Sequence, residues 1–185
     1  WWGSIPPDQK PMDDLSLVYD SEVLDAPFEI LGRPVARLRV SASAKRANWV
    51  VRISDIAPDG QVTQVAAAAF NGTHRNSARD PDEIIPGEEF DLSIDLHSTS
   101  WIFAKGHRIR VAVNNAIWPM LWPTPFPMET KLLIGGNHGL KIEFPVVPFK
   151  NKKSPNFKEP SANPMLTGYK SLDSGNITGY AAIDS

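Results

Sequence analysis

Short runs of alternating apolar and polar residues recur along this chain, separated by prolines and glycines. In residues 108–113, for example, isoleucine and valine alternate with arginine and alanine. Alternation with a period of two is typical of strands that bury one face of a sheet. The chain has 17 prolines and 12 glycines among 185 residues, and no long helical pattern is present. The sequence therefore predicts an all-β fold, either a sandwich or a barrel.

We predict about eight short antiparallel strands between Leu15 and Val147. The alternating patterns place them at residues 15–19, 35–42, 49–54, 61–70, 90–97, 109–113, 131–134 and 140–144. A turn is predicted at Pro58-Asp59-Gly60, because proline fixes φ and glycine accepts a positive φ. The last two strands flank a glycine-rich segment and are predicted to pair with each other as a hairpin.

The ends of the chain differ in composition from its centre. Residues 1–14 contain three prolines and no periodicity, so we expect an extended lead-in or linker. Residues 15–148 are expected to form the β-domain. Residues 149–185 begin with a polar, lysine-rich linker and end in a short β arm that cannot bury a core of its own. We expect this arm to dock on the β-domain, to join a second copy of the chain in a homo-oligomer, or to open a further domain.

Charge and composition limit the classes of partner. Lys and Arg number 19 and Asp and Glu 21, which gives a formal net charge of −2. This balance predicts no nucleic-acid partner and no binding to an anionic membrane. The absence of cysteine excludes disulfides and thiolate nucleophiles. We expect a soluble protein, and the lack of a signal-peptide layout favours the cytoplasm over secretion.

The sequence offers no catalytic constellation. No serine lies in the G-x-S-x-G pattern of a nucleophile held on a strand-to-helix turn. The glycines at 135–139 lack the lysine and the helix that follow a phosphate-binding loop. The spacing of the histidines is not that of a zinc site; they are His74, His97, His107 and His138. We therefore predict no catalytic residue, no metal and no cofactor for this chain.

A loop rich in aromatic rings and prolines follows the strand at 109–113. Its prolines exclude a regular helix and a central strand. A rigid aromatic loop at the end of a strand is a candidate lining for a substrate pocket; the alternative is that its rings close one end of a sandwich. The candidate pocket residues are Trp118, Trp122, Phe126, Asn114 and Asn115.

Four segments, in this order, carry a family resemblance. They are LVYDSE at 17–22, WVVRISDIAPDG at 49–60, the stretch from Pro86-Gly87 to Ile94-Asp95-Leu96, and FAKGHRIR at 103–110. Over roughly residues 15–148 the chain resembles the C-terminal domain of the X-prolyl dipeptidyl-peptidases and cocaine-esterase-like (CocE/NonD) hydrolases. In that family the domain is a jelly-roll, galactose-binding-like β-sandwich. It follows an α/β-hydrolase domain that carries a Ser-Asp-His triad.

The resemblance implies that this chain is the non-catalytic part of a serine hydrolase, an X-Pro dipeptidyl-peptidase or an acyl esterase. Residues 1–14 would then link it to the upstream α/β-hydrolase domain, whose substrate pocket its loops would help to shape. Two parts depart from the family pattern. Many relatives have a more polar segment in place of 114–123, and 149–185 is not covered. The alternative is a free-standing carbohydrate-binding module that presents aromatic rings to sugars, with Asn114 and Asn115 as polar partners.

Overall fold

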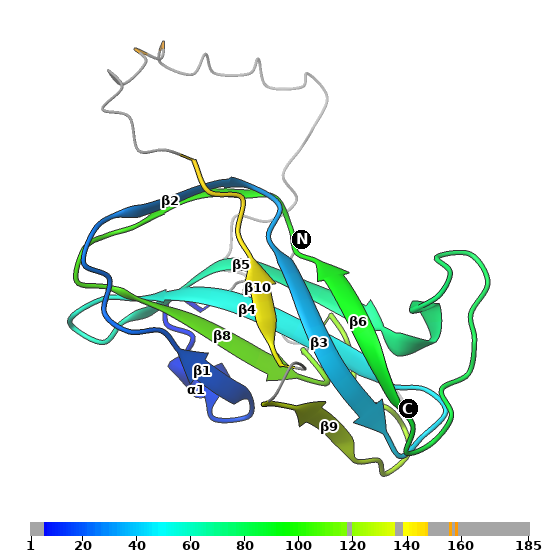
Figure 1. Ribbon diagram of the computed structural model, residues 1–185. Coiled ribbons are helices and arrows are strands. Elements are labelled where there is room, and N and C mark those ends of the chain that lie inside the picture. Colours follow the sequence, from blue (N-terminus) through cyan, green and yellow to red (C-terminus); the bar gives the residue numbers. More distant parts are fainter. Residues whose placement is uncertain (1–5, 118–119, 136–138, 148–155, 157, 159–185) are drawn as a thin grey trace, which may run out of the picture. The chain divides into compact units, whose positions relative to one another are not determined.

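The computed structural model of the chain describes residues 6–117, 120–135, 139–147, 156 and 158. Strands dominate this part of the chain, so the all-β prediction is confirmed (Figure 1). In chain order the elements are α1 (Lys10–Asp13), β1 (Leu17–Asp20), β2 (Phe28–Gly32), β3 (Val35–Ala42), β4 (Asn48–Ile56), β5 (Val62–Asn71), η1 (Gly72–His74), β6 (Glu89–Asp95), β7 (Thr99–Phe103), β8 (Arg108–Asn114), β9 (Thr130–Leu133) and β10 (Lys141–Glu143).

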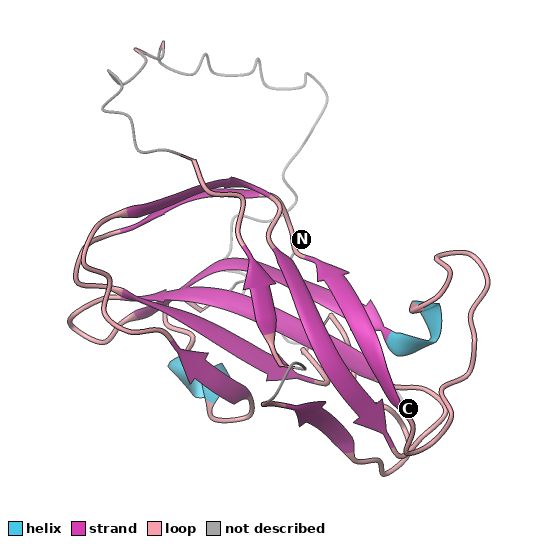
Figure 2. Cartoon of the chain, in the orientation of Figure 1, coloured by secondary structure: helices cyan, strands magenta, loops and turns pink. Residues whose placement is uncertain are grey.

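Two antiparallel sheets pack against each other as a β-sandwich (Figure 2). One sheet has the strand order β1-β8-β4-β5, and the other has the order β10-β3-β6, with β9 also paired to β3. Strands β2 and β7 form a separate two-stranded sheet. The sandwich is the predicted fold class, whereas its likeness to galactose-binding domains stays a prediction.

The alternating patterns bury one common core between the sheets. Val51 and Ile53 of β4 and Leu38 and Val40 of β3 are almost fully buried within it. The ring of Trp49 meets that of a β6 phenylalanine edge to face, with centroids 5.5 Å apart. Burying an aliphatic or aromatic side chain of this size contributes about 1.5–3 kcal/mol. The core therefore stabilises the sandwich and fixes which face of each strand points inward.

The predicted hairpin of the last two strands is wrong. Strand β9 pairs with β3 at Arg39–Ala42, and β10 pairs with the same strand at Val35–Arg37. Both run antiparallel to β3, and β6 occupies the other edge of β3. Strands β9 and β10 therefore lie end to end along one edge of β3. Pairing with β3 adds each of them to a larger sheet, whereas an isolated two-stranded hairpin is only marginally stable in water.

Strand β4 is buried on both faces, which its alternating pattern does not indicate. The outward-facing Val50, Arg52 and Ser54 are as inaccessible as the core residues between them. Part of the cover comes from α1 and its flanks, since Gln9 and Asp13 are buried against Arg52. The segment predicted as an extended lead-in thus includes a short helix that packs on the outside of the sandwich.

The chain divides into two compact units, residues 1–150 and 151–185. Apart from residues 156 and 158, the second unit lies outside the described residues. The predicted β arm and its role in a homo-oligomer therefore stay predictions. Within the described ranges, no helix is long and apolar enough to cross a membrane.

Candidate functional site

A buried polar cluster holds the N-terminal segment on the sandwich. Arg52, with 1% of its side chain exposed, donates from Nη2 to Asp13 Oδ1 at 2.9 Å and from Nη1 to Gln9 Oε1 at 2.8 Å. Arg110 of β8 donates to the other oxygen of Asp13 at 3.0 Å and binds Asp20 through two bonds of 2.7 Å. One carboxylate thus joins two arginines on neighbouring strands.

The electrostatics of this cluster follow from burial. Burial lowers the pKa of the Arg52 guanidinium from its ordinary value, and the nearby Asp13 carboxylate offsets part of that effect. The hydrogen bond to Asp20 raises the pKa of Arg110. Both arginines stay charged, because an arginine pKa lies far above neutral pH. The segment from Gln9 to Asp20 is therefore fixed by charge-assisted hydrogen bonds.

Next to this segment lies an apolar groove of about 520 Å³. One wall comes from the N-terminal segment and the other from the end of β8 and the loop after it. The residues that line it are Pro11, Met12, Leu15, Asn114, Asn115, Ala116, Ile117 and Pro123. No charged side chain is among them. A smaller cavity of about 330 Å³ is also lined by Leu15, Asn114 and Asn115. The groove suits an uncharged, largely apolar occupant.

The two predicted asparagines lie in this groove, but their amide nitrogens are already engaged. Asn114 donates from Nδ2 to Ser16 Oγ at 3.1 Å, and Asn115 donates from Nδ2 to Thr130 Oγ1 at 3.4 Å. Asn114 Oδ1 is buried and accepts no hydrogen bond among the described residues. Such an acceptor is costly, because burial removes its water.

The aromatic candidates lie in the loop that follows. Trp122 is 64% exposed and Phe126 is 40% exposed, so neither ring is enclosed by the core. Pro123, next to Trp122 in sequence, lines the groove. Trp118 lies outside the described residues. The predicted pocket lining therefore stays a prediction, with two of its three rings accessible to a partner.

Sequence reasoning missed the N-terminal wall of the groove. Leu15 is 84% exposed, the highest value among the large apolar residues of the described chain. The alternating pattern assigned it to the first strand, whereas β1 begins two residues later. The sequence pattern did not separate Leu15 from that strand, so only the structure shows where it lies. The partners that complete this wall, Pro11 and Met12, carried no pattern at all.

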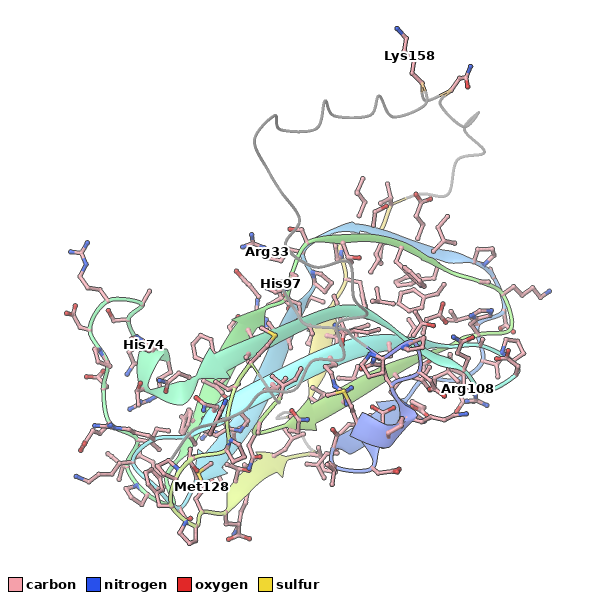
Figure 3. All side chains as sticks on the ribbon, turned by 180° about the vertical axis from the view of Figure 1, so that it is seen from behind. Arg33, His74, His97, Arg108, Met128 and Lys158 are labelled. Atoms are coloured by element: carbon pink, nitrogen blue, oxygen red, sulfur yellow. The ribbon has the colours of Figure 1, made fainter. Side chains whose placement is uncertain are left out.

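The histidines do not form a site. Figure 3 labels His74 after β5 and His97 after β6, on separate segments. His107 lies 2.8 Å through Nδ1 from Asp55 Oδ1, and Trp101 donates to the other oxygen of Asp55 at 3.0 Å. His138 lies outside the described residues. Among the described residues, no group of three or more His, Asp or Glu side chains could hold a metal ion.

Three of the segments that carry the family resemblance meet in space. Asp20 of the first binds Arg110 of the last, and Ser21 Oγ accepts the backbone N–H of Ile109. Asp55 of the second segment binds His107 of the last. These contacts join β1, β4 and β8 and the turn before β8. These three segments therefore lie together in the sheet that contains β1, β8 and β4.

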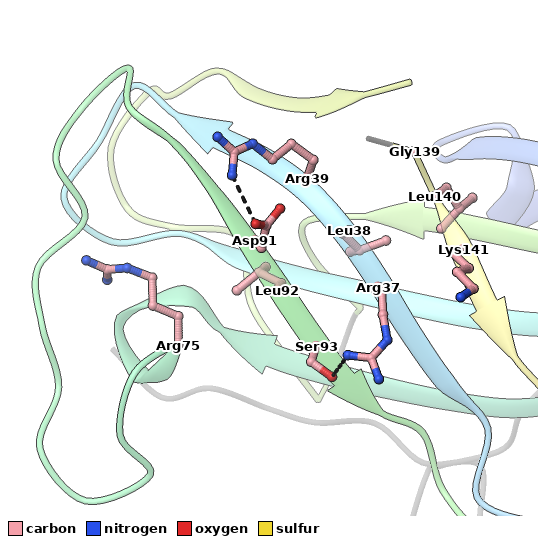
Figure 4. A pocket seen from close by; sticks show the side chains of 10 residues that line it. All are labelled: Arg37, Leu38, Arg39, Arg75, Asp91, Leu92, Ser93, Gly139, Leu140 and Lys141. Atoms are coloured by element: carbon pink, nitrogen blue, oxygen red, sulfur yellow. Dashed lines mark hydrogen bonds and ion pairs between the residues drawn. The ribbon is translucent and has the colours of Figure 1, made fainter. Parts of the chain in front are cut away.

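A further cavity of about 530 Å³ crosses the outward face of β3 and β6 (Figure 4). Its cationic side chains are already paired. Arg39 lies 3.1 Å from Asp91 and Arg37 lies 2.8 Å from Glu143. The guanidinium of Arg75 donates to backbone carbonyls of its own loop. This face carries a ladder of ion pairs, which stabilise little. Lys141 also pairs with Glu143, so each cation among the described residues that line the cavity already has a partner.

The fold and the groove define a class of protein: a β-sandwich domain with an apolar groove between its anchored N-terminal segment and an aromatic loop. Residues 6–137 match the family described as the X-Pro dipeptidyl-peptidase C-terminal non-catalytic domain. This match covers well over half of the chain. The chain belongs to this family, as its sequence motifs predicted.

Individual relatives agree with this assignment. The chain is 35% identical over 116 residues to the cocaine esterase of Rhodococcus sp. (strain MB1 Bresler), a match that covers 62% of this chain and 20% of the esterase. An aminopeptidase from a marine sediment Thaumarchaeota archaeon superimposes with a TM-score of 0.71 and 26% identity, over 76% of this chain and 27% of that one. An α-amino acid ester hydrolase shares the fold, with a TM-score of 0.70 and 23% identity over the same shares of the two chains. The chain thus spans about a fifth to a quarter of these relatives.

Proposed function

We propose that this chain is the C-terminal domain of a serine hydrolase and that it packs on the α/β-hydrolase domain that precedes it. In this position it helps to shape the substrate pocket of that domain. The parent would be an X-Pro dipeptidyl-peptidase or an acyl esterase. Family membership supports the hydrolase class, and the small share of each relative that the chain spans supports a larger parent.

The observation that carries the proposal is the apolar groove with its exposed rim. Leu15, which lines it, and Trp122, which precedes the lining residue Pro123, leave most of their surface accessible. Apolar surface of this kind commonly marks an interaction site. Burying a leucine or an aromatic side chain contributes about 1.5–3 kcal/mol each. A docked domain would recover this free energy at the groove.

The position of the N-terminal segment supports the same partner. The described chain begins beside the start of β5, where Pro7 and Asp8 accept from Gln61 and Val62, and then passes through α1 to the wall of the groove. A tethered partner acts at a high effective concentration, and short linkers reach the millimolar range. An upstream domain therefore needs little intrinsic affinity to occupy the groove.

The alternative function, a free-standing carbohydrate-binding module, has weaker support. Sugar hydroxyls need available amide donors beside an aromatic platform. Each predicted donor, Asn114 or Asn115, already commits one of its two amide hydrogens to a side chain of this chain. Saturable binding to a glycan panel would favour this alternative over docking.

The test of the proposed function compares two proteins, this chain alone and the parent with its upstream region. Each is assayed with a p-nitrophenyl acyl ester and an X-Pro-nitroanilide. We expect hydrolysis by the parent only. Turnover by this chain alone would contradict the proposal.

A variant of the groove then tests docking within the parent. We expect Leu15→Ser with Trp122→Ser to lower kcat/KM or the thermal stability of the parent. The matched control is Leu31→Ser, which removes an exposed leucine on β2 outside the groove. Equal values for the groove variant and the control would contradict a docking role for the groove.

A further inference from the structure

Strand β5 ends at Asn71, and the residue that follows is Gly72. An asparagine before a glycine is intrinsically prone to lose its side-chain amide, because the glycine has no Cβ to hinder the attack of its nitrogen on the amide carbon. This reaction is one reason why asparagine is a thermolabile residue. No other asparagine of the sequence precedes a glycine. The chain therefore carries one pair of this kind.

The reaction at such a pair uses only the chain itself and water. The backbone nitrogen of Gly72 forms a bond to Cγ of Asn71 and gives up its hydrogen. The Cγ–Nδ2 bond breaks, and the amide nitrogen takes that hydrogen and leaves as ammonia. Water then opens the resulting succinimide ring at one of its two carbonyls. Opening yields aspartate or isoaspartate, in which the backbone runs through the former side chain.

The folded backbone holds the two reacting atoms apart. Ring closure needs the nitrogen of Gly72 nearly eclipsed with Cβ of Asn71, because a five-membered succinimide is almost planar. Asn71 instead has the extended ψ of 117°, which turns that nitrogen well away from Cβ. The same nitrogen donates to the carbonyl of Ala47 at 2.9 Å. Ring closure therefore requires this peptide group to rotate and to lose its hydrogen bond.

The side-chain amide is held as firmly as the backbone. Asn71 Oδ1 accepts from the backbone nitrogen of Thr73 at 3.0 Å and from Thr73 Oγ1 at 2.9 Å. Both bonds cap η1, and Thr73 is buried. Gly72 is in close contact with the ring of Trp49, which leaves no room for a Cβ. Asn71 itself is exposed, so water reaches the amide even though the reacting geometry is excluded.

We propose that Asn71 is a site of spontaneous deamidation, which the folded domain suppresses and which local opening of the β5–η1 junction permits. Such opening breaks the bonds to Thr73 and Ala47 and frees the ψ angle of Asn71. Isoaspartate at this position would make the opening permanent, because its longer backbone does not fit between the pairing with Asn48 and the buried Thr73. The proposal involves only residues of this chain and does not depend on the proposed function.

The test incubates the intact protein in native buffer and in denaturing urea and follows deamidation at position 71 by peptide mass spectrometry. If only the open form reacts, the native rate is the denatured rate multiplied by the open fraction. We expect the native rate to be lower by about tenfold or more, because opening breaks the hydrogen bonds to Thr73 and Ala47. Equal rates in the two conditions would overturn the proposal.

A variant of the cap tests whether these contacts are the cause. Thr73→Val removes one hydrogen bond to Asn71 with little change of shape. We expect its native rate to rise about twofold to tenfold and its denatured rate to stay the same. The matched control is Thr99→Val on β7, which should change neither rate. An unchanged native rate in Thr73→Val would overturn the proposal.

Two further measurements identify the site and the kind of opening. Asn71→Gln should abolish the modification at position 71, because a glutamine would have to close a six-membered ring, which is much slower. Modification that persisted there would contradict the mechanism. The unfolding midpoint of Thr73→Val distinguishes local from global opening. A rise in the native rate no larger than the loss of global stability accounts for would overturn the local opening proposed for the β5–η1 junction.

Discussion

Replacement of Asp13 by alanine tests how the N-terminal segment is held. The side chain of Asp13 is 5% exposed and bridges Arg52 and Arg110. Its removal leaves the buried guanidinium of Arg52 with Gln9 and Ser16 as neutral partners. Arg110 keeps its two hydrogen bonds to Asp20, so the loss of Asp13 removes less of its stabilisation. The expected result is a large loss of stability and release of the segment that contains α1.

The magnitude follows from the burial of Arg52. Removing one partner of a buried ion pair costs about 3–5 kcal/mol, because the other charge is left uncompensated. For a chain of this length each kcal/mol shifts the melting temperature by about 2–4 °C, so we expect a decrease of about 6–20 °C. A loss of this size is a considerable fraction of the 5–15 kcal/mol, roughly, that stabilises a typical domain.

The assays are urea unfolding and thermal unfolding of the isolated chain, both followed by circular dichroism, with Asp14→Ala as the control. Asp14 is the exposed neighbour of Asp13, and its loss should cost less than about 0.5 kcal/mol. The double variant Asp13→Leu with Arg52→Met should recover much of the stability, because it removes both charges. A cost below about 1 kcal/mol for Asp13→Ala, or no recovery in the double variant, would refute the argument that an uncompensated buried charge is the cause.

Three further predictions concern other contacts. Gly72→Ala should destabilise the chain by about 1–3 kcal/mol in chemical unfolding, because the added Cβ would lie 2.4 Å from Cζ3 of the buried Trp49. Asp55→Leu should cost about 1–3 kcal/mol in the same assay and shift tryptophan fluorescence, because it leaves the donors of an indole and an imidazole unpaired. A hydrogen bond from Arg37 lowers the pKa of Glu143. The stability that this pair contributes is therefore present above the ordinary glutamate pKa and is lost as the pH falls through the lowered pKa. Glu143→Gln should flatten the acid side of a plot of unfolding free energy against pH.

Each of these predictions has a matched control. Gly139→Ala adds a Cβ with no atom closer than 4.0 Å and should be nearly neutral. Asp25→Leu removes an exposed aspartate and should leave the fluorescence unchanged. Glu88→Gln, also exposed, should leave the pH profile as it is. If a variant and its control behaved alike, the contact named for that variant would not be the cause.

The sequence by itself determined the strands and several of their turns. Alternation in β3, β6 and β8 predicted both the strands and their inward faces, because the period of a strand is two whatever surrounds it. The Pro58-Asp59-Gly60 turn was also predictable, since Gly60 has the positive φ of 87° that the motif indicates. Local chemistry of this kind acts within a few residues and is visible in the sequence.

The tertiary structure alone decided what covers each face and which distant segments meet. The pattern of β4 gives no sign that Arg52 is buried, because that burial depends on Asp13, 39 residues earlier in the chain. The patterns of β9 and β10 likewise give no sign that both strands share one edge of β3. Strand pairing depends on the apolar surface that the paired strands bury together. The groove joins residues 11–15 to residues 114–123 for the same reason. Contacts between segments far apart in the chain form only when the whole sandwich assembles, so the site became visible with the fold.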